Sequence, residues 1–193
     1  MIKHYYMGLD LSLTGAGMVV LEDPEDDSAL SAKTGKVLVQ RIMGHSLTKD
    51  ATVKEKTERQ IDIAKAIIAE ARTWEYGDCE LHVAIENYAF STVQNKKGKS
   101  FQSSSQTGLA ELHGVVKSQL LLAMGISPVL YSVKTARMVV LGNGNFPKKD
   151  VKPKLNSWGY EFKKTDDADA FVIAECHRQK LKGWTDDRKK RKK

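Results

Sequence analysis

The sequence predicts an α/β fold in which helices flank a mixed five-stranded sheet whose first three strands are antiparallel. Three observations predict it. Short apolar runs with turn residues between them open the chain, long segments with helical spacing follow, and further apolar runs then alternate with helical segments. With 193 residues, of which 41% are hydrophobic, the chain can bury a core and is too apolar to be disordered. We expect one domain over residues 1–182 and a basic, disordered tail over residues 183–193.

The first three strands lie near the start of the chain. Apolar runs at 4–11 and 16–21 are joined by the turn 12–15, and residues 36–43 form a third run. An Asp/Glu/Pro cluster over residues 22–31 predicts an exposed acidic loop before the third strand. Connections of this kind favour an antiparallel meander.

A helical period begins near residue 50. Val53, Ile61 and Ile68 recur at helical spacing, which predicts an amphipathic helix over 50–73. We then expect a strand at 81–86, a polar loop at 88–107, a helix at 103–125 and a strand at 128–131. Three further helices are expected near 133–141, 148–157 and 166–181. The inward face of the last helix is expected to carry Ala170, Phe171, Ile173 and Ala174.

Charge is distributed unevenly along the chain. The formal net charge is +7. Residues 1–87 sum to −5, residues 88–164 to +9, and the terminal run 188–193 to +6. A concentrated positive segment favours a polyanion, such as a nucleic acid, bound on one part of the surface.

Membrane and secreted proteins are excluded by other patterns. No apolar run is long enough to span a membrane, and the first residues show no secretory signal pattern. Cys79 and Cys176 have no metal-binding spacing and are interpreted as reduced thiols. We therefore expect an intracellular protein of the cytoplasm or nucleoid, with no membrane partner.

Four acids stand where catalytic acids would be useful. Asp10 ends the first apolar run, and Glu86 ends the run 81–86. If the first and fourth strands are neighbours, these two acids lie side by side. Asp166 and Asp169 are three residues apart at the start of the last helix, which puts them on one face, about 5–6 Å apart at Cβ. Converging acids repel one another unless a cation lies among them. Oxygen ligands suit Mg²⁺ or Mn²⁺, and two such ions can support phosphodiester cleavage.

Each acid also has a plain structural interpretation. An acid at a strand end is often simply solvated, and Asp166 could cap the last helix while Asp169 interacts with the helix dipole. The four acids together, beside a segment of net charge +9, favour the metal site. Asp167 points about 100° around the helix from Asp166 and is left out of the ligand set.

Five motifs then occur in order over roughly residues 3–180. They are Gly8-Leu9-Asp10 with Thr14-Gly15-Ala16-Gly17; Ala84-Ile85-Glu86; His113-Gly114-Val115; Ser132-Val133-Lys134 with Gly142-Asn143-Gly144 and Lys148-x-x-Val151; and Asp166-Asp167-Ala168-Asp169-Ala170. Together they resemble the motifs of the RuvC Holliday-junction resolvases, which belong to the ribonuclease-H-like superfamily.

This resemblance implies a ribonuclease-H-like fold and a homodimer that binds a four-way DNA junction. The two subunits would nick opposed strands symmetrically and leave 5′-phosphate and 3′-hydroxyl ends. The resemblance also implies two Mg²⁺ per active site, which Mn²⁺ can replace. The implied catalytic residues are the metal-binding acids Asp10, Glu86, Asp166 and Asp169 and the basic residues Lys134 and Lys148.

The sequence also departs from that pattern. The turn after Asp10 is shorter, and the segment between Lys134 and Gly142 is longer, than in the bacterial enzymes. The acidic insert at 22–31 and the basic run 188–193 also differ from the compact bacterial form. These departures suggest a divergent branch, for example a viral one acting in the host cytoplasm.

A loop beside the second acid and a lysine-rich segment supply candidate DNA contacts. In the loop, an aromatic ring could stack on an unpaired base while lysines hold phosphates. The alternative is that the aromatic residues cover the edge of the core. The candidates are Tyr88, Phe90, Lys96, Lys97, Lys99, Lys134, Lys148 and Lys149.

The helix over 103–125 carries apolar residues beyond one stripe, among them Leu120, Leu121 and Leu122. A second apolar face predicts a dimer interface, and the alternative is a fully buried core helix.

The sequence favours a Mg²⁺-dependent junction endonuclease over three other functions. The first alternative is a broader nuclease for branched DNA such as flaps and forks. The second is a non-catalytic DNA-binding module, which the four acids argue against because needless buried acids cost stability. The third is an actin-like ATPase, which needs two such domains and a second Gly-rich phosphate loop.

Overall fold

The computed structural model describes residues 2–23, 35–48, 50–87, 93–94, 100–101 and 104–183. Its main sheet has the strand order β3-β2-β1-β4-β7. The three leading strands are antiparallel neighbours, while β4 and β7 run parallel to β1. The strands are β1 (Lys3–Asp10), β2 (Ala16–Glu22), β3 (Lys36–Met43), β4 (Cys79–Glu86) and β7 (Val129–Tyr131). The predicted α/β fold, with a mixed five-stranded sheet and an antiparallel start, is confirmed.

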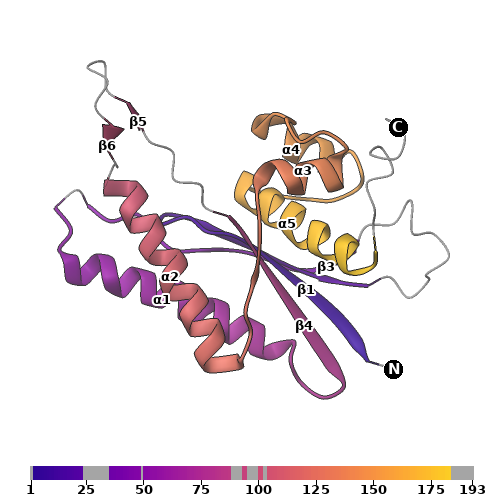
Figure 1. The fold of residues 1–193 in the computed structure, drawn as a ribbon, viewed down its shortest axis with the longest axis horizontal. Coiled ribbons are helices and arrows are strands. Elements are labelled where there is room, and N and C mark those ends of the chain that lie inside the picture. Colours follow the sequence, from indigo (N-terminus) through magenta and orange to yellow (C-terminus); the bar gives the residue numbers. More distant parts are fainter. Residues whose placement is uncertain are drawn as a thin grey trace.

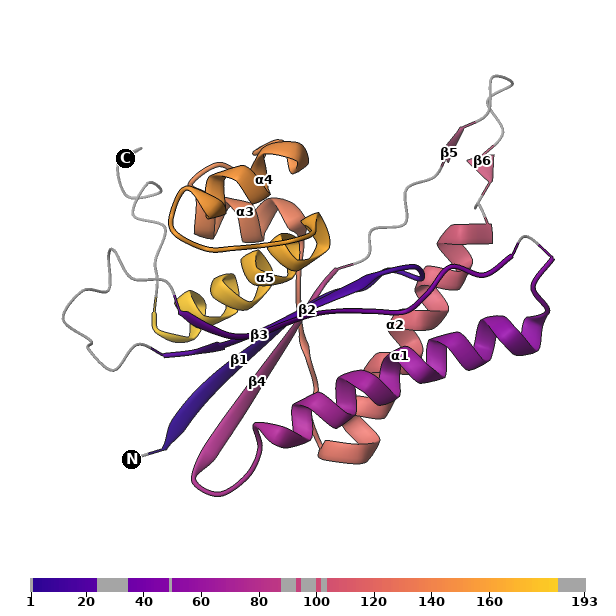
Figure 2. The same cartoon turned by 180° about the vertical axis from the view of Figure 1, so that it is seen from behind.

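Helices cover both faces of this sheet (Figure 1). One face is covered by α1 (Val53–Thr73) and α2 (Ser104–Met124). The other is covered by α5 (Thr165–Leu181), against which α3 (Val133–Leu141) and α4 (Lys148–Asn156) pack. Figure 2 shows the same two layers from behind. None of the described helices combines the length and apolar character that a membrane span requires.

The side chains of β1 alternate between two separate hydrophobic cores. Tyr5, Met7 and Leu9 pack in the core under α1 and α2, whereas Tyr6 packs in the core under α5. Successive side chains of a strand point to opposite faces, so a strand buried on both sides reads as a continuous apolar run. This explains why the sequence of β1 shows an apolar run and no alternation.

Capping residues fix where the helices begin. The first long helix starts at Val53, three residues later than the sequence predicts, because Thr52 and Glu55 form a capping box. The Glu55 amide donates to Oγ1 of Thr52 at 3.2 Å, and the Thr52 amide donates to Oε2 of Glu55 at 2.7 Å. Ser132 caps α3 by accepting from the Thr135 amide at 3.1 Å.

Two predictions need correction. The segment 88–107, expected to be an irregular loop, contains the short antiparallel strands β5 (Val93–Gln94) and β6 (Ser100–Phe101). Strands of two residues are too short to show alternation in a sequence. The last helix, expected to bury one face, is buried from Asp167 to Arg178 all around. It lies between the sheet on one side and α3 and α4 on the other.

Some candidate residues lie outside the described residues. These are the loop residues Tyr88, Phe90, Lys96, Lys97 and Lys99, together with residues 184–193 of the predicted tail.

Candidate active site

Two of the four predicted acids end neighbouring parallel strands. Leu9 of β1 lies opposite Ile85 of β4, so Asp10 and Glu86 follow at the same edge of the sheet. The first and fourth strands are neighbours, which is the condition under which the sequence places Asp10 and Glu86 side by side. The carboxyl edge of a parallel pair is where α/β proteins commonly place a functional site.

The other two acids arrive on α5, which approaches the sheet closely over two glycines. A Cβ on Gly17 would lie 2.2 Å from the carbonyl oxygen of Asp166, and one on Gly8 would lie 2.1 Å from that of Ala170. Both distances are far below a van der Waals contact, so only glycine allows the helix this position. The close packing sets Asp166 and Asp169 over the strand that carries Asp10.

The four carboxylates influence one another electrostatically. Burial raises the pKa of Asp10 to about 8, and the charges of Glu86 and Asp169 add to the rise. Burial also raises the pKa of Glu86, with Asp169 as the next cause. Asp166 adds a smaller repulsion to both. The structure thus brings all four predicted acids to one place.

The structure also bears on the capping role considered for Asp166 and on the omission of Asp167 from the ligand set. The helix begins at Thr165 after Lys164, so Asp166 does not cap it. Asp167 is buried, and burial raises the pKa of its carboxyl group. The nearby cations that oppose this rise are Lys164 and Lys152. Asp167 also feels the negative charge of Asp166, which adds to the rise, but it is not among the groups that raise the pKa of Asp10 or Glu86.

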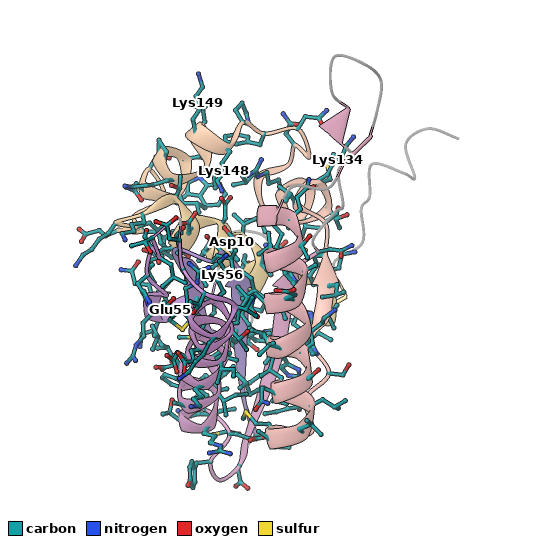
Figure 3. All side chains as sticks on the ribbon, turned by 90° about the vertical axis from the view of Figure 1, so that its left-hand side faces the viewer. Asp10, Glu55, Lys56, Lys134, Lys148 and Lys149 are labelled. Atoms are coloured by element: carbon teal, nitrogen blue, oxygen red, sulfur yellow. The ribbon has the colours of Figure 1, made fainter. Side chains whose placement is uncertain are left out.

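One predicted lysine lies among the acids. Nζ of Lys148, at the start of α4, is 3.1 Å from Oδ2 of Asp169 and 3.8 Å from Oδ1 of Asp166. Partial burial would lower the pKa of Lys148, but Asp169 and Asp10 raise it above its usual value. Figure 3 shows Lys148 beside Asp10 at this edge of the molecule. The Lys148 ammonium therefore stays charged and partly offsets the negative charge of the site.

The other two predicted lysines lie at the periphery. Lys149 is exposed, and its side chain points away from Asp10 (Figure 3). Lys134, in the first turn of α3, is also exposed. Its stem packs against Gly144, where a Cβ would lie 2.8 Å from Cγ of Lys134. Among the ion pairs of the described residues, neither lysine contacts the acids.

Arg137 is the site residue that the sequence reasoning missed. Its Nη2 lies 3.2 Å from Oδ1 of Asp169, and its Nη1 donates to the carbonyl of Phe146 at 2.9 Å. The side chain is only 12% exposed. A signal was available, because Arg137 stands three residues after Lys134 and so lies near it on the surface of the same helix. The guanidinium holds Asp169 in place and fixes the loop after α3.

Arg137→Met should destabilise the protein by about 3 kcal/mol, because the carboxylate of Asp169 loses a buried partner. For a chain of this size, that corresponds to a fall in Tm of about 6–12 °C. Thermal unfolding followed by circular dichroism measures it. Arg72→Met, at an exposed position in the last turn of α1, is the matched control and should leave the Tm unchanged. Equal Tm values for the two variants would contradict the role of Arg137.

The donor set of the site fits a hard divalent cation. It consists of carboxylate oxygens, which Mg²⁺ and Mn²⁺ prefer, and it includes no thiolate or imidazole. The pKa of Asp10 is raised first by burial and then by the charges of Glu86 and Asp169, and Lys148 opposes this rise only in part. A bound cation would supply the missing positive charge and return Asp10 to its ionised form.

Comparison with known proteins shows the fold. The chain is similar to the Thermus thermophilus RuvC structure, with a TM-score of 0.66 and 17% identity over 92% of this chain and 95% of that one. T. thermophilus RuvC in complex with a Holliday junction substrate matches with a TM-score of 0.64 and 16% identity, over the same shares of both chains. The yeast mitochondrial Holliday junction resolvase Ydc2 matches with a TM-score of 0.52 and 15% identity, over 90% of this chain and 78% of that one.

By sequence, no family model and no curated protein matches the chain. The likeness is therefore one of three-dimensional structure, and it extends over nearly the whole chain. The chain has the ribonuclease-H-like fold of the RuvC resolvases.

Proposed function

We propose that this protein is a metal-dependent endonuclease that resolves four-way DNA junctions by paired, symmetric nicks. The observation that carries the proposal is the gathering of Asp10, Glu86, Asp166 and Asp169 at one edge of a RuvC-like sheet. One of the similar structures, T. thermophilus RuvC, is bound to a Holliday junction. A junction substrate would place the protein with cellular DNA, in the cytoplasm or nucleoid.

The four acids would hold two Mg²⁺, or Mn²⁺ in their place. When bound, such ions activate water and stabilise the leaving oxygen of a phosphodiester, which yields 5′-phosphate and 3′-hydroxyl ends. In this chain, Arg137 orients Asp169 through the contact at 3.2 Å. The Lys148 ammonium, which pairs with Asp166 and Asp169 in this structure, lies where it can pair instead with a phosphate of the cleaved strand.

The basic surface around this edge supports DNA binding. Lys134, Lys148 and Lys149 are exposed on α3 and α4, and Lys148 also contacts Asp166 and Asp169. Lysines of this kind contact phosphates and position the duplex, and they do not read sequence. The aromatic and lysine residues between β4 and α2 stay proposed contacts, since they lie outside the described residues.

Two symmetric cuts require two active sites, which a homodimer provides. An apolar surface suited to self-association lies at the edge of the sheet. Leu121 and Leu122 of α2 are 55% and 79% exposed, and Val129 and Leu130 of the edge strand β7 are 40% and 42% exposed. These exposed residues argue against a fully buried α2 and favour the proposed dimer.

The proposed function is tested on a synthetic four-way junction with the purified full chain. With Mg²⁺, we expect paired nicks at symmetric positions, whose products a ligase can reseal because of their 5′-phosphate and 3′-hydroxyl ends. Chelation by EDTA should abolish cutting, and added Mn²⁺ should restore it. A linear duplex of the same sequence is the control.

Other outcomes would replace the proposal. Equal cutting of flaps, forks and junctions would make the protein a general branched-DNA nuclease. Junction binding without cutting in either metal would make it a binding module. ATP hydrolysis without any response to branched DNA would place it among the actin-like ATPases.

A further inference from the structure

A second group of possible metal ligands lies at the opposite end of the sheet from the acids. His4 is the second residue of β1, while Glu80 and His82 lie near the start of β4. Figure 1 shows the starts of these two strands together, beside the N-terminus. His4 is opposite Glu80 in the strand register. Asp10 is six residues along β1 from His4, which is roughly 20 Å. The group is therefore separate from the candidate active site.

The three side chains converge to the spacing of a metal site. Nδ1 of His4 is 3.1 Å from Nε2 of His82. The carboxylate of Glu80 reaches both rings, with Oε2 at 3.5 Å from Nδ1 of His4 and Oε1 at 3.8 Å from Nε2 of His82. One ligand atom from each residue lies within 4.8 Å of the others, a spacing that no three of the four active-site acids reach in the described chain.

These distances match tetrahedral coordination. Zinc binds imidazole nitrogen and carboxylate oxygen at about 2.0–2.2 Å, so neighbouring ligand atoms around a tetrahedral ion are about 3.3 Å apart. The two ring nitrogens are 3.1 Å apart, and each lies near a different oxygen of Glu80, at 3.5 Å for His4 and 3.8 Å for His82, so the side chains are close to this spacing. Two imidazoles and one carboxylate also form a donor set that suits Zn²⁺ far better than Mg²⁺.

The rings are held in place before any ion binds. His82 stacks on Tyr6, with centroids 5.1 Å apart and planes at 20°. The hydroxyl of Tyr6 in turn donates to Oδ2 of Asp23 at 3.1 Å. His4 stacks on His82 at 5.4 Å. Ligands whose orientation is fixed by packing lose little entropy on binding a metal.

The group is also open to solvent. The side chains of His4 and Glu80 are 39% and 56% exposed, and that of His82 is 18% exposed. An ion can therefore enter. His177 lies near His82, with ring centroids 6.1 Å apart, but its Nδ1 is 3.0 Å from the hydroxyl of Tyr131. The fourth coordination position is thus left to water or an exogenous ligand.

We infer that His4, Glu80 and His82 form a binding site for a transition-metal ion of the Zn²⁺ class. The ion would join the start of β1 to the start of β4, in addition to the parallel ladder and the contacts among the three side chains. Because the site is remote from the acids, it is a structural clamp with one open position and has no part in DNA cutting.

Isothermal titration of the full chain with Zn²⁺, in millimolar Mg²⁺ to occupy the acids, tests the inference. We expect one Zn²⁺ per chain. His4→Gln and His82→Gln should each weaken binding more than about 100-fold, since even partners outside the coordination shell account for 10–100-fold. At free Zn²⁺ about 100-fold above Kd, the Tm should rise by about 5 °C or more. Bound Co²⁺ should give the strong visible absorption of a four-coordinate ion.

His45→Gln is the matched control, because His45 is an exposed histidine elsewhere on the surface. It should bind Zn²⁺ as the wild type does. His4 is partly exposed near the start of a strand, so we expect His4→Gln to fold. It therefore tests the site even if His82→Gln fails to fold. Zn²⁺ binding that His4→Gln leaves unchanged, or no Zn²⁺ binding in the presence of Mg²⁺, would overturn the inference.

Discussion

Asp10→Asn should abolish junction cutting while making the metal-free protein more stable at alkaline pH. The loss of cutting should be at least about 1,000-fold, because a carboxylate that would hold the proposed metal ions is replaced by a neutral amide. Junction binding should persist, since the lysines proposed to contact phosphates are unchanged. Gel-shift and cleavage assays on the same junction measure both properties.

The gain in stability follows from the sign of the pKa shift. Asp10 titrates at about 8 in the folded protein, compared with 3.8 for an unperturbed side chain. The unfolded chain therefore releases this proton first, and the contribution of Asp10 to stability is lost as pH rises from about 4 to about 8. Above pH 8, Asp10→Asn should raise the Tm by about 5 °C or more, and below pH 4 the difference should vanish.

Asp62→Asn, an identical change on the exposed side of α1, is the control and should alter neither property. Mg²⁺ should raise the Tm of the wild type more than that of Asp10→Asn, because the ion offsets the charge of Asp10. A Tm for Asp10→Asn that falls at pH 8.5, or cutting at the wild-type rate, would show that Asp10 is not the repelled acid described above.

Gly17→Ala should have the largest effect on stability. The added methyl group would lie 2.2 Å from the carbonyl oxygen and 2.5 Å from the carbonyl carbon of Asp166, and neither backbone atom can move without shifting α5. The cost should be about 3 kcal/mol or more, which lowers the Tm by about 6–12 °C. Cutting at low temperature should fall about 100-fold, since the same shift displaces the carboxylate of Asp166. Thermal unfolding and single-turnover cleavage measure the two effects.

Gly114→Ala provides the opposite case with the same added methyl group. Gly114 lies within α2, and a Cβ there meets nothing within 4 Å. Alanine should stabilise that helix by up to about 1 kcal/mol and leave cutting unchanged. If Gly17→Ala unfolded at the same temperature as Gly114→Ala, the inference that α5 packs too closely on the sheet for a Cβ at Gly17 would be contradicted.

Much of the fold could be predicted from the sequence, because its signals are local. The strand 36–43 and the helix 133–141 have the predicted bounds, since an apolar run or a capping serine marks each one. The four acids could be selected because each stands at the end or the start of a regular element. Their convergence also required the neighbouring positions of β1 and β4, which the topology supplies.

What the sequence could not indicate depends on contacts between distant segments. The salt bridge between Arg137 and Asp169 joins two helices through side chains 32 positions apart. Likewise, His4 and His82 meet because β1 and β4 are paired in one particular register, and a shift by one residue would separate their rings. The full burial of α5 requires three other elements to be in place around it.

The position of α5 has a consequence for the order in which the protein matures during synthesis. A ribosome that has translated the chain as far as α4 has produced Asp10 and Glu86 but not Asp166 or Asp169. The nascent chain then has half of the acids and one face of its sheet uncovered, because α5 supplies most of the core on that face. Folding of this layer and completion of the acid cluster therefore coincide, at the moment when α5 emerges. An unfinished chain would therefore lack the complete acid cluster on which the proposed cutting depends.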